Sequence, residues 1–352
     1  MLHALSPYNV VRLILGRDEP RDDETHNKYT RASDHFRAWR EEAVMIPTKQ
    51  PAWFPYEMRF RFQGEQRRVR GLICEVELEP WGGSIVPHER TMTAPVQDRL
   101  ALLRRVRANL SPVYALSRGP RRELAGLLDD VVSGTEPVAA VSDEDGVDHR
   151  MWVLDDGPDI PGWLAPEQLL IADGHHRYTV ALAFRDEMRA EHGPGPWDRM
   201  MMFVVDAGTE DPPVLPIHRV LLQGDVAPDG RRVHDLAEVL SSLRDDDLGY
   251  GTVTLEDDRA IHRVRQLRGE PPTVCELHEQ VLAGVDANLR FVPDAVAAEE
   301  AVRSGQARAS FFLPPTRVER IRGVIDRHGR LPQKSTYFWP KPRTGFVIRP
   351  FE

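Results

Sequence analysis

The sequence predicts a globular protein of the α+β or α/β class. Patterns typical of helices and of strands alternate along its 352 residues. The hydrophobic content of 41% lies in the range of globular domains once glycine is counted. A short apolar run, Leu169 to Ala172, leads directly into a glycine turn and then a helical pattern. These observations exclude a disordered, collagen-like or coiled-coil chain for the bulk of the sequence.

In the first third of the chain, periodicity predicts each element in turn. The apolar run at 10–15 is predicted to be a strand. Apolar residues recur at intervals of three and four from Tyr29 to Ala43, which indicates a helix. Two strands are expected at 56–62 and 70–78, and a further helix runs from residue 98 to about residue 109.

The later elements follow the same reasoning. The chain is expected to divide into residues 1–222, which carry the sharpest motifs, and an α+β region at 223–352. The remaining predicted elements are strands at 113–116, 169–172, 201–205 and 214–222, a hairpin of 138–141 with 149–154, and helices at 123–132, 178–191 and 318–328.

Charge and cysteine content limit the classes of partner. The net charge of −9 argues against binding along a nucleic-acid backbone. Two cysteines, Cys74 and Cys275, are too few for a disulfide scaffold or a four-thiolate zinc site. No apolar run is long enough for a membrane helix, and the residues before Pro7 are too short for a signal peptide. We expect a cytoplasmic protein, and its oligomeric state stays open.

The segment Asp173-Gly174-His175-His176-Arg177 carries the strongest sign of chemistry. It lies where a buried strand ends and a helix begins, so backbone N–H groups and the helix dipole favour an anion there. The arginine adds a forked cation suited to phosphate, and the aspartate could hold Mg²⁺ or accept a hydroxyl proton. The alternative is a helix-capping aspartate with surface histidines. The adjacent histidines point to different sides of a helix and do not form a shared zinc site.

A second group of polar residues, His88-Glu89-Arg90-Thr91, precedes the helix that begins near residue 98. It places an acid, a base, a guanidinium and a hydroxyl in one loop. Glu89 is a candidate general base or metal ligand. The alternative is a solvated loop with a surface ion pair.

Two further pairs of residues are candidate anion or substrate contacts. His218 and Arg219 lie on a predicted strand, where such a pair is usually structural. Lys334 and Ser335 precede further hydroxyl-bearing residues near the C-terminus, but no glycine-rich phosphate loop comes before them. An ordinary extended tail is the alternative for the second pair.

Taken together, these motifs resemble the family named domain of unknown function 1015, over nearly the whole chain. Family members usually have some tens of residues before the first motif, including Pro-Pro-Tyr-Asp, whereas this sequence starts at that motif. Either its start is misassigned or a piece of the site is missing. The segments that carry the resemblance are Ser6–Arg12, Pro87–Thr91, Asp98–Leu100, Ala108–Pro112 (which includes Asn109), Asp173–Tyr178, Leu215–Arg219 and Pro332–Phe338.

The central motif also resembles the phosphate-binding box of the ParB/sulfiredoxin superfamily. ParB proteins have a Gly-Glu-Arg-Arg box for CTP, and sulfiredoxin has Gly-Cys-His-Arg for ATP. Free-serine kinases have Asp-Gly-His-x-Arg, which is the most similar of the three because it shares the aspartate at position 173. The sulfiredoxin cysteine is replaced by His175, which excludes that chemistry. The resemblance implies a mixed-sheet core with an additional α+β part.

The resemblance implies a Mg²⁺-dependent phosphotransferase that uses ATP or ADP on a small hydroxylated metabolite, with free L-serine as the leading acceptor. Asp173, Glu89 and His175 would be catalytic, and Asp173 would also hold the metal. The expected nucleotide and phosphate contacts are Gly174, His176, Arg177, His88, Arg90, Thr91, Lys334 and Ser335, and the expected substrate contacts are His218, Arg219 and Asn109.

Other functions stay open at this point. A nucleotide-binding regulatory switch would bind CTP or ATP without converting a metabolite. A hydrolase would use the histidines without a nucleotide. If the family's N-terminal piece is essential, the chain would be an inactive relative.

Overall fold

The protein divides into two compact units in the computed structural model, which describes residues 2–89, 94–155, 160–164, 168–224, 229–243, 248–269, 273–284 and 288–352. Unit 1 comprises Met1–Pro87, Thr91–Asp211 and Pro340–Glu352. Unit 2 comprises His88–Arg90 and Pro212–Trp339. The C-terminal residues therefore pack with the N-terminal part of the chain, after the whole of unit 2 has been traversed.

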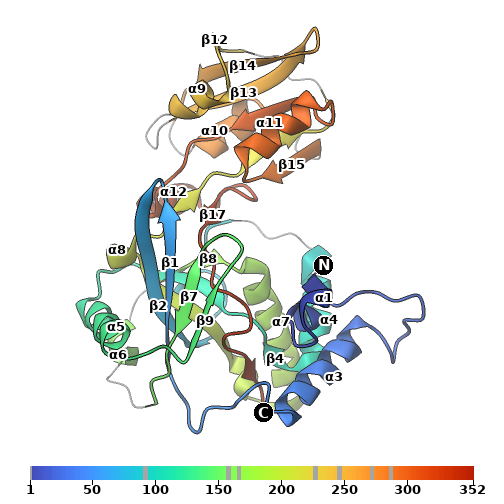
Figure 1. The fold of residues 1–352 in the computed structure, drawn as a ribbon, viewed down its shortest axis with the longest axis vertical. Helices are drawn as coiled ribbons and strands as arrows, with labels where there is room; N and C mark the ends of the chain where they lie inside the picture. Colours follow the sequence, from blue (N-terminus) through green and yellow to red (C-terminus); the bar gives the residue numbers. More distant parts are fainter. Residues whose placement is uncertain are drawn as a thin grey trace. The chain divides into compact units, whose positions relative to one another are not determined.

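Unit 1 is built around a mixed sheet of eight strands in the order β3-β8-β5-β9-β2-β1-β7-β6 (Figure 1). The pairs β3–β8 and β5–β9 are parallel, and the other neighbours are antiparallel. The strands are β1 (Phe54–Phe62), β2 (Glu65–Glu77), β3 (Ile85–Pro87), β5 (Val113–Ser117), β6 (Ala139–Ser142), β7 (Asp148–Met151), β8 (Leu169–Asp173) and β9 (Arg199–Asp206).

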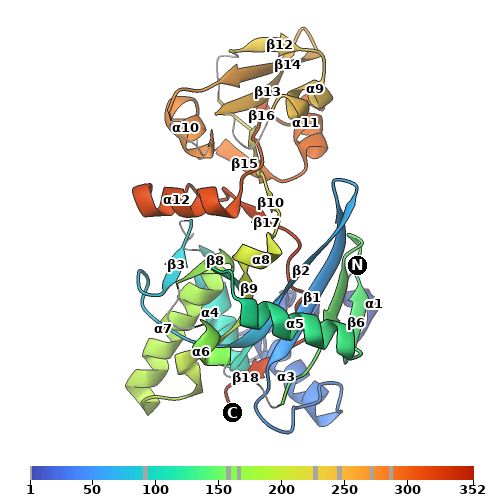
Figure 2. The same cartoon turned by 90° about the vertical axis from the view of Figure 1, so that its left-hand side faces the viewer.

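The helices of unit 1 surround this sheet, with α4 and α7 side by side (Figure 2). A two-stranded ladder, β4 (Ala108–Asn109) with β18 (Arg349–Pro350), attaches the C-terminal segment. The helices are α1 (Leu2–Leu5), α2 (Val11–Ile14), α3 (Lys28–Glu41), α4 (Ala94–Val106), α5 (Arg122–Gly134), α6 (Ile160–Leu164), α7 (His175–His192), α8 (Ala207–Glu210) and the 3₁₀ turn η1 (Pro196–Asp198).

Side chains point alternately to the two faces of the sheet, and those on one face form the core that fixes the end of β8. Leu72 and Cys74 on β2 lie two residues apart, so they point to the same face of the sheet. They pack with Ile171 of β8 and with Tyr178 and Ala181 of α7 in one buried cluster. The strand and the helix that follows it are therefore fixed on either side of the turn at Gly174.

Unit 2 contains an antiparallel sheet of six strands in the order β12-β14-β13-β16-β11-β15. A separate two-stranded ladder joins β10 to β17. The elements are β10 (Val214–Leu215), β11 (His218–Leu221), β12 (Arg231–Val233), α9 (Leu236–Ser241), β13 (Gly249–Glu256), β14 (Arg259–Gln266), α10 (Thr273–Gln280), β15 (Leu289–Val292), α11 (Ala295–Arg303), β16 (Ala309–Phe312), α12 (Val318–His328) and β17 (Tyr337–Phe338).

The predicted fold class is confirmed, and so are most of the predicted elements. Helices α3, α7 and α12 and strands β1, β2, β8 and β9 occur where the periodicity predicts them. No helix among the described residues combines the length and apolar character needed to cross a membrane.

Two of the predicted strands are wrong. Residues Val11–Ile14 form a single helical turn, α2, and just before it the Asn9 side chain accepts the N–H of Val11 at 3.0 Å. The strand predicted at 214–222 is divided into β10 and β11, which belong to different sheets. Pro216 lies at the break, where it cannot donate a hydrogen bond to a strand ladder.

Because His218 is buried, we expect the protein to lose stability in acid. Its Nδ1 accepts the N–H of Leu313 at 3.2 Å, and burial lowers the pKa of His218 to about 4. Because an unfolded histidine has a pKa of about 6.5, the unfolded state gains a proton between pH 6.5 and 4 while the folded state does not. The free energy of unfolding should fall over this window, by about 1 to 3 kcal/mol from this group.

In the variant His218→Asn, the amide oxygen replaces Nδ1 as an acceptor of the same hydrogen bond, and the amide does not titrate. Urea unfolding at pH 7 and pH 4.5 should show a smaller loss of stability for the variant than for the natural protein. An equal loss in both proteins would assign the acid sensitivity to other groups.

Candidate functional site

The turn between β8 and α7 is set by one glycine. Gly174 has φ +105°, in the left-handed region that a residue with a Cβ rarely adopts. It ends β8 at Asp173 and allows α7 to begin at His175, with Tyr178 N–H bonded to the Gly174 carbonyl at 2.9 Å. The first amides of an 18-residue helix therefore follow a carboxylate directly.

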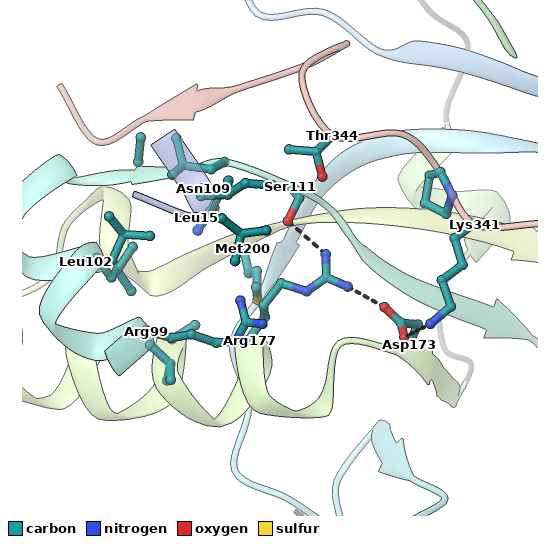
Figure 3. A pocket seen from close by; sticks show the side chains of 17 residues that line it. Leu15, Arg99, Leu102, Asn109, Ser111, Asp173, Arg177, Met200, Lys341 and Thr344 are labelled. Atoms are coloured by element: carbon teal, nitrogen blue, oxygen red, sulfur yellow. Dashed lines mark hydrogen bonds and ion pairs between the residues drawn. The ribbon is translucent and has the colours of Figure 1, made fainter. Parts of the chain in front are cut away.

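Asp173 lies between two cations. One carboxylate oxygen accepts from Arg177 Nη2 at 2.5 Å, and the other accepts from Lys341 Nζ at 2.5 Å. Figure 3 shows the two cations approaching Asp173 from opposite sides. Arg177 lies four residues after Asp173, in the first turn of α7, whereas Lys341 comes from the C-terminal segment 168 residues away.

These charges keep Asp173 ionised. Burial alone raises the pKa of this carboxyl, but the positive charges of Arg177 and Lys341 outweigh it and lower the pKa to about 2. Burial lowers the pKa of Arg177, and the charge of Asp173 opposes that change. At neutral pH the site is therefore a carboxylate held between a guanidinium and an ammonium.

The remaining donors of Arg177 hold it against the loop before β5. Its Nη1 donates to Ser111 Oγ at 2.9 Å and also to the carbonyl of Pro112. The planar guanidinium is thereby oriented by three different partners, which a lysine at this position could not do.

A cavity of about 320 Å³ opens beside these residues, within the size range of small-molecule sites. Three of its lining side chains are cationic and one is a carboxylate, so the described wall has a net charge of +2, although the whole chain carries −9. The wall consists of Ile14, Leu15, Arg99, Leu102, Leu103, Ala108, Asn109, Leu110, Ser111, Asp173, Arg177, Val180, Ala181, Met200, Lys341, Pro342 and Thr344.

The donor set does not form a metal site by itself. Among the described residues, no group of three or more His, Cys, Asp or Glu side chains could hold a metal ion. Asp173 is the one carboxylate in the described cavity wall, and both of its oxygens face cations. Because Mg²⁺ needs oxygen ligands, these residues do not fit a resident ion.

The two histidines of the central motif begin α7 but do not belong to the described cavity wall. His175 is buried, and its ring stacks on Trp81 with the centroids 6.4 Å apart. His176, the next residue of the helix, is partly exposed.

Asn109 does line the cavity, as part of β4. Its side-chain oxygen accepts the N–H of Met201 at 3.1 Å. Four polar residues of the cavity wall were not predicted as site residues: Arg99, Ser111, Lys341 and Thr344. The sequence does carry one local signal at Lys341: the prolines on both sides of it keep the chain extended and exclude a helix.

His88 and Glu89 of the second predicted motif belong to unit 2. His88 is buried, and its Nε2 lies 2.5 Å from Thr336 Oγ1. Glu89 forms a parallel bridge with Leu331. Unit 2 therefore brings this motif together with the C-terminal Lys-Ser-Thr segment. Arg90 and Thr91 lie outside the described residues.

The other two predicted pairs meet in the same part of unit 2. Arg219 is fully buried, and it donates to the carbonyls of Ile217, Gln333 and Lys334. Its guanidinium thus anchors the loop in which the Lys334 side chain is exposed and Ser335 Oγ donates to the Pro332 carbonyl. His218, next to Arg219, is buried and holds the N–H of Leu313.

A comparison with protein families finds a match over residues 1–270 to the family described as "Protein of unknown function (DUF1015)". The chain belongs to the DUF1015 family. This confirms the resemblance drawn from the sequence motifs. A comparison with curated proteins found no match for this DUF1015 chain.

The solved structures that match this DUF1015 protein share little sequence with it. A free serine kinase in complex with AMP has 14% identity and a TM-score of 0.40, over 83% of this chain and 89% of that one. A conserved hypothetical protein from Pyrococcus furiosus has 13% identity and a TM-score of 0.39, over 75% and 89%. C-terminally truncated SbnI from Staphylococcus aureus has 9% identity and a TM-score of 0.41, over 77% and 84%.

The close surroundings of Gly174 leave little room for a side chain, which a substitution can test. A Cβ at Gly174 would lie 3.0 Å from Arg177 Nη2 and 3.1 Å from Val113, at a φ that already disfavours a side chain. Gly174→Ala should lower the free energy of unfolding by about 1 to 3 kcal/mol and should displace Arg177. Gly64→Ala is the matched control, because Gly64 also has positive φ but open space around it. Urea unfolding of both variants measures the difference, and equal losses would mean that the Arg177 contact contributes nothing.

Proposed function

We propose that this DUF1015 protein is a nucleotide-dependent phosphotransferase that acts on a small hydroxylated metabolite, with free L-serine as the leading acceptor and ATP or ADP as the donor. The observation that carries the proposal is the cavity at the β8–α7 turn, where an ionised aspartate is held between cations beside an apolar wall. We expect the protein to act in the cytoplasm without a nucleic-acid partner.

The cationic part of the cavity supports binding of phosphate groups. Arg177 and Arg99 present guanidinium groups, and Lys341 presents an ammonium group. Phosphoryl transfer needs the neutralisation of negative charge and the positioning of the reacting groups more than it needs covalent chemistry. A net charge of +2 in a partly buried wall supplies such neutralisation.

The apolar part of the cavity supports binding of a base or another flat apolar group. Leu102, Leu103 and Val180 lie in the same wall as the cations. A site with a mostly apolar lining and a few charged groups at one end is typical of small-molecule pockets.

In this proposal Asp173 orients the acceptor hydroxyl. A carboxylate with a pKa of about 2 is a weak base but remains an acceptor of hydrogen bonds at all physiological pH values. An acceptor hydroxyl would donate to Asp173, and its oxygen would thereby be directed at the phosphorus atom. The proton passes to the carboxylate or to water as the new P–O bond forms and the bond to the nucleotide leaving group breaks.

Further roles follow the sequence motif and stay proposals. Gly174, His175 and His176 would contribute contacts to phosphate at the start of α7. In unit 2, Glu89 would supply a second acid, and His88, Lys334 and Ser335 would supply secondary anion contacts. The described residues give Mg²⁺ no site of its own, so any Mg²⁺ would enter together with the nucleotide phosphates.

The first experiment is a thermal-shift screen with ATP, ADP, CTP and GTP, each with and without Mg²⁺ and L-serine. A ligand that binds only the folded state raises the melting temperature by mass action. We expect a shift with an adenine nucleotide that L-serine increases, and formation of O-phosphoserine in the same mixtures. Binding without an acceptor-dependent turnover would favour a regulatory switch, and no shift with any nucleotide would refute the proposal.

Removal of the guanidinium at the turn should weaken nucleotide binding. Arg177→Ala is expected to raise the Kd for ADP about 10- to 100-fold, because a charge-assisted hydrogen bond to phosphate contributes about 1.5 to 3 kcal/mol. Calorimetric titration measures the affinity, and circular dichroism checks that the variant is folded. Arg37→Ala, which removes an exposed arginine of α3, is the control. An unchanged Kd in folded Arg177→Ala would show that the turn is not the phosphate site.

Asp173→Asn should separate binding from turnover. Loss of the negative charge raises the net charge of the described wall to +3, which offsets the loss of the ion pairs that hold Arg177 and Lys341, so the Kd for ADP should change no more than a few-fold. Turnover should fall at least 100-fold, because an amide cannot take up the hydroxyl proton as the new P–O bond forms. If ADP binding weakened and turnover fell only in proportion, Asp173 would be a binding residue instead.

A further inference from the structure

A closed ring of hydrogen bonds lies next to the cavity, in unit 1. The Tyr56 hydroxyl accepts the backbone N–H of Arg343 at 3.0 Å and lies 2.8 Å from His149 Nδ1. His149 Nε2 lies 2.9 Å from Asp143 Oδ2, and the same carboxylate oxygen accepts from Arg343 Nε at 3.0 Å. The ring therefore begins at the backbone of Arg343 and ends at its side chain.

For a neutral His149 the ring has only one consistent direction. The carboxylate of Asp143 can only accept, so Nε2 of His149 carries the hydrogen and Nδ1 accepts from the Tyr56 hydroxyl. Tyr56 and His149 are each 1% exposed. Burial lowers the pKa of His149, although the Asp143 carboxylate opposes it, and this favours the neutral ring that the direction requires.

The segment that the ring holds is the one that brings Lys341 to the cavity. We define the strap as residues 340–348. Phe346 packs edge-on against Tyr56, with the ring centroids 5.3 Å apart. After the strap, β18 pairs with β4, whose residues Ala108 and Asn109 line the cavity. The strap is thus held at its centre by Arg343 and Phe346, and the pairing of β18 with β4 holds the chain just after its C-terminal end.

We propose that Tyr56, His149 and Asp143 are positioning residues, which fix Arg343 so that Lys341 is held at Asp173 in the cavity. Lys341 precedes Arg343 by two residues, so the Cα atoms of the two are at most about 7 Å apart. Fixing one therefore restricts the other. The effect on ligand affinity rests on the proposed function, whereas the effect on the position of Lys341 does not.

The physical reason is preorganisation. A lysine side chain has about 2 kcal/mol of rotamer entropy, and its backbone adds more freedom when the segment is loose. A strap that is already fixed has lost this freedom before a ligand arrives, so the ligand does not have to order it. No group of the ring belongs to the described cavity wall, so its effect on a ligand must pass through the strap.

The first test measures the position of Lys341 without any ligand. Acetic anhydride acetylates lysines, and mass spectrometry reads the rate at each site. In the natural protein Lys341, paired with Asp173, should react several-fold more slowly than the exposed Lys49 and Lys334. Arg343→Ala should raise the Lys341 rate several-fold and leave the other two unchanged, and so should Tyr56→Phe. An unchanged Lys341 rate in both folded variants would overturn the proposal.

The second test is a double-mutant cycle on the affinity for ADP. Lys341→Ala alone should raise the Kd about 10-fold, and Arg343→Ala alone about 3- to 10-fold. If Arg343 acts through Lys341, the double variant should bind no more weakly than Lys341→Ala. Additive losses would overturn the positioning role. A Kd unaffected by Lys341→Ala, together with faster acetylation in Arg343→Ala, would refute the proposed function and leave the positioning role standing.

Discussion

The candidate site depends on one interaction, the contact of the Asp173 carboxylate with Arg177 and Lys341. Two cations near each other in a partly buried wall would repel, and a buried carboxylate alone would take up a proton. The carboxylate and the two cations stabilise each other's charged forms, and the pKa of Asp173 falls to about 2 as a result. The interaction also joins the β8–α7 turn to the C-terminal segment of the same unit.

The backbone around this interaction explains why it forms. The core of unit 1 fixes β8 and α7 on either side of Gly174, whose positive φ permits the sharp change of direction. Arg177, one helical turn further, then points back at the strand end and is oriented by Ser111. Lys341 has no such rigid element of its own, and its segment is held by Arg343 and Phe346.

The distribution of charge separates this site from the rest of the surface. The chain as a whole is acidic, so it repels large polyanions, whereas the described cavity wall has a net charge of +2. Such a combination selects small anions that can enter a cavity and be surrounded by cations. Exposed ion pairs elsewhere on the protein contribute little to stability.

Local sequence patterns were sufficient to locate several elements and the central motif. Periodicity locates α3, α7 and α12, and the Asp-Gly-His-His-Arg pattern predicts a polar turn at the end of β8, since these signals depend on residues near in sequence. Periodicity was wrong at 10–15, where a short apolar run forms a helical turn after Asn9 instead of a strand. The contact of Lys341 with Asp173 across 168 residues and the anchoring of the Lys334 loop by Arg219 follow from tertiary packing alone. Such contacts form because distant segments pack together, and no local pattern carries that information.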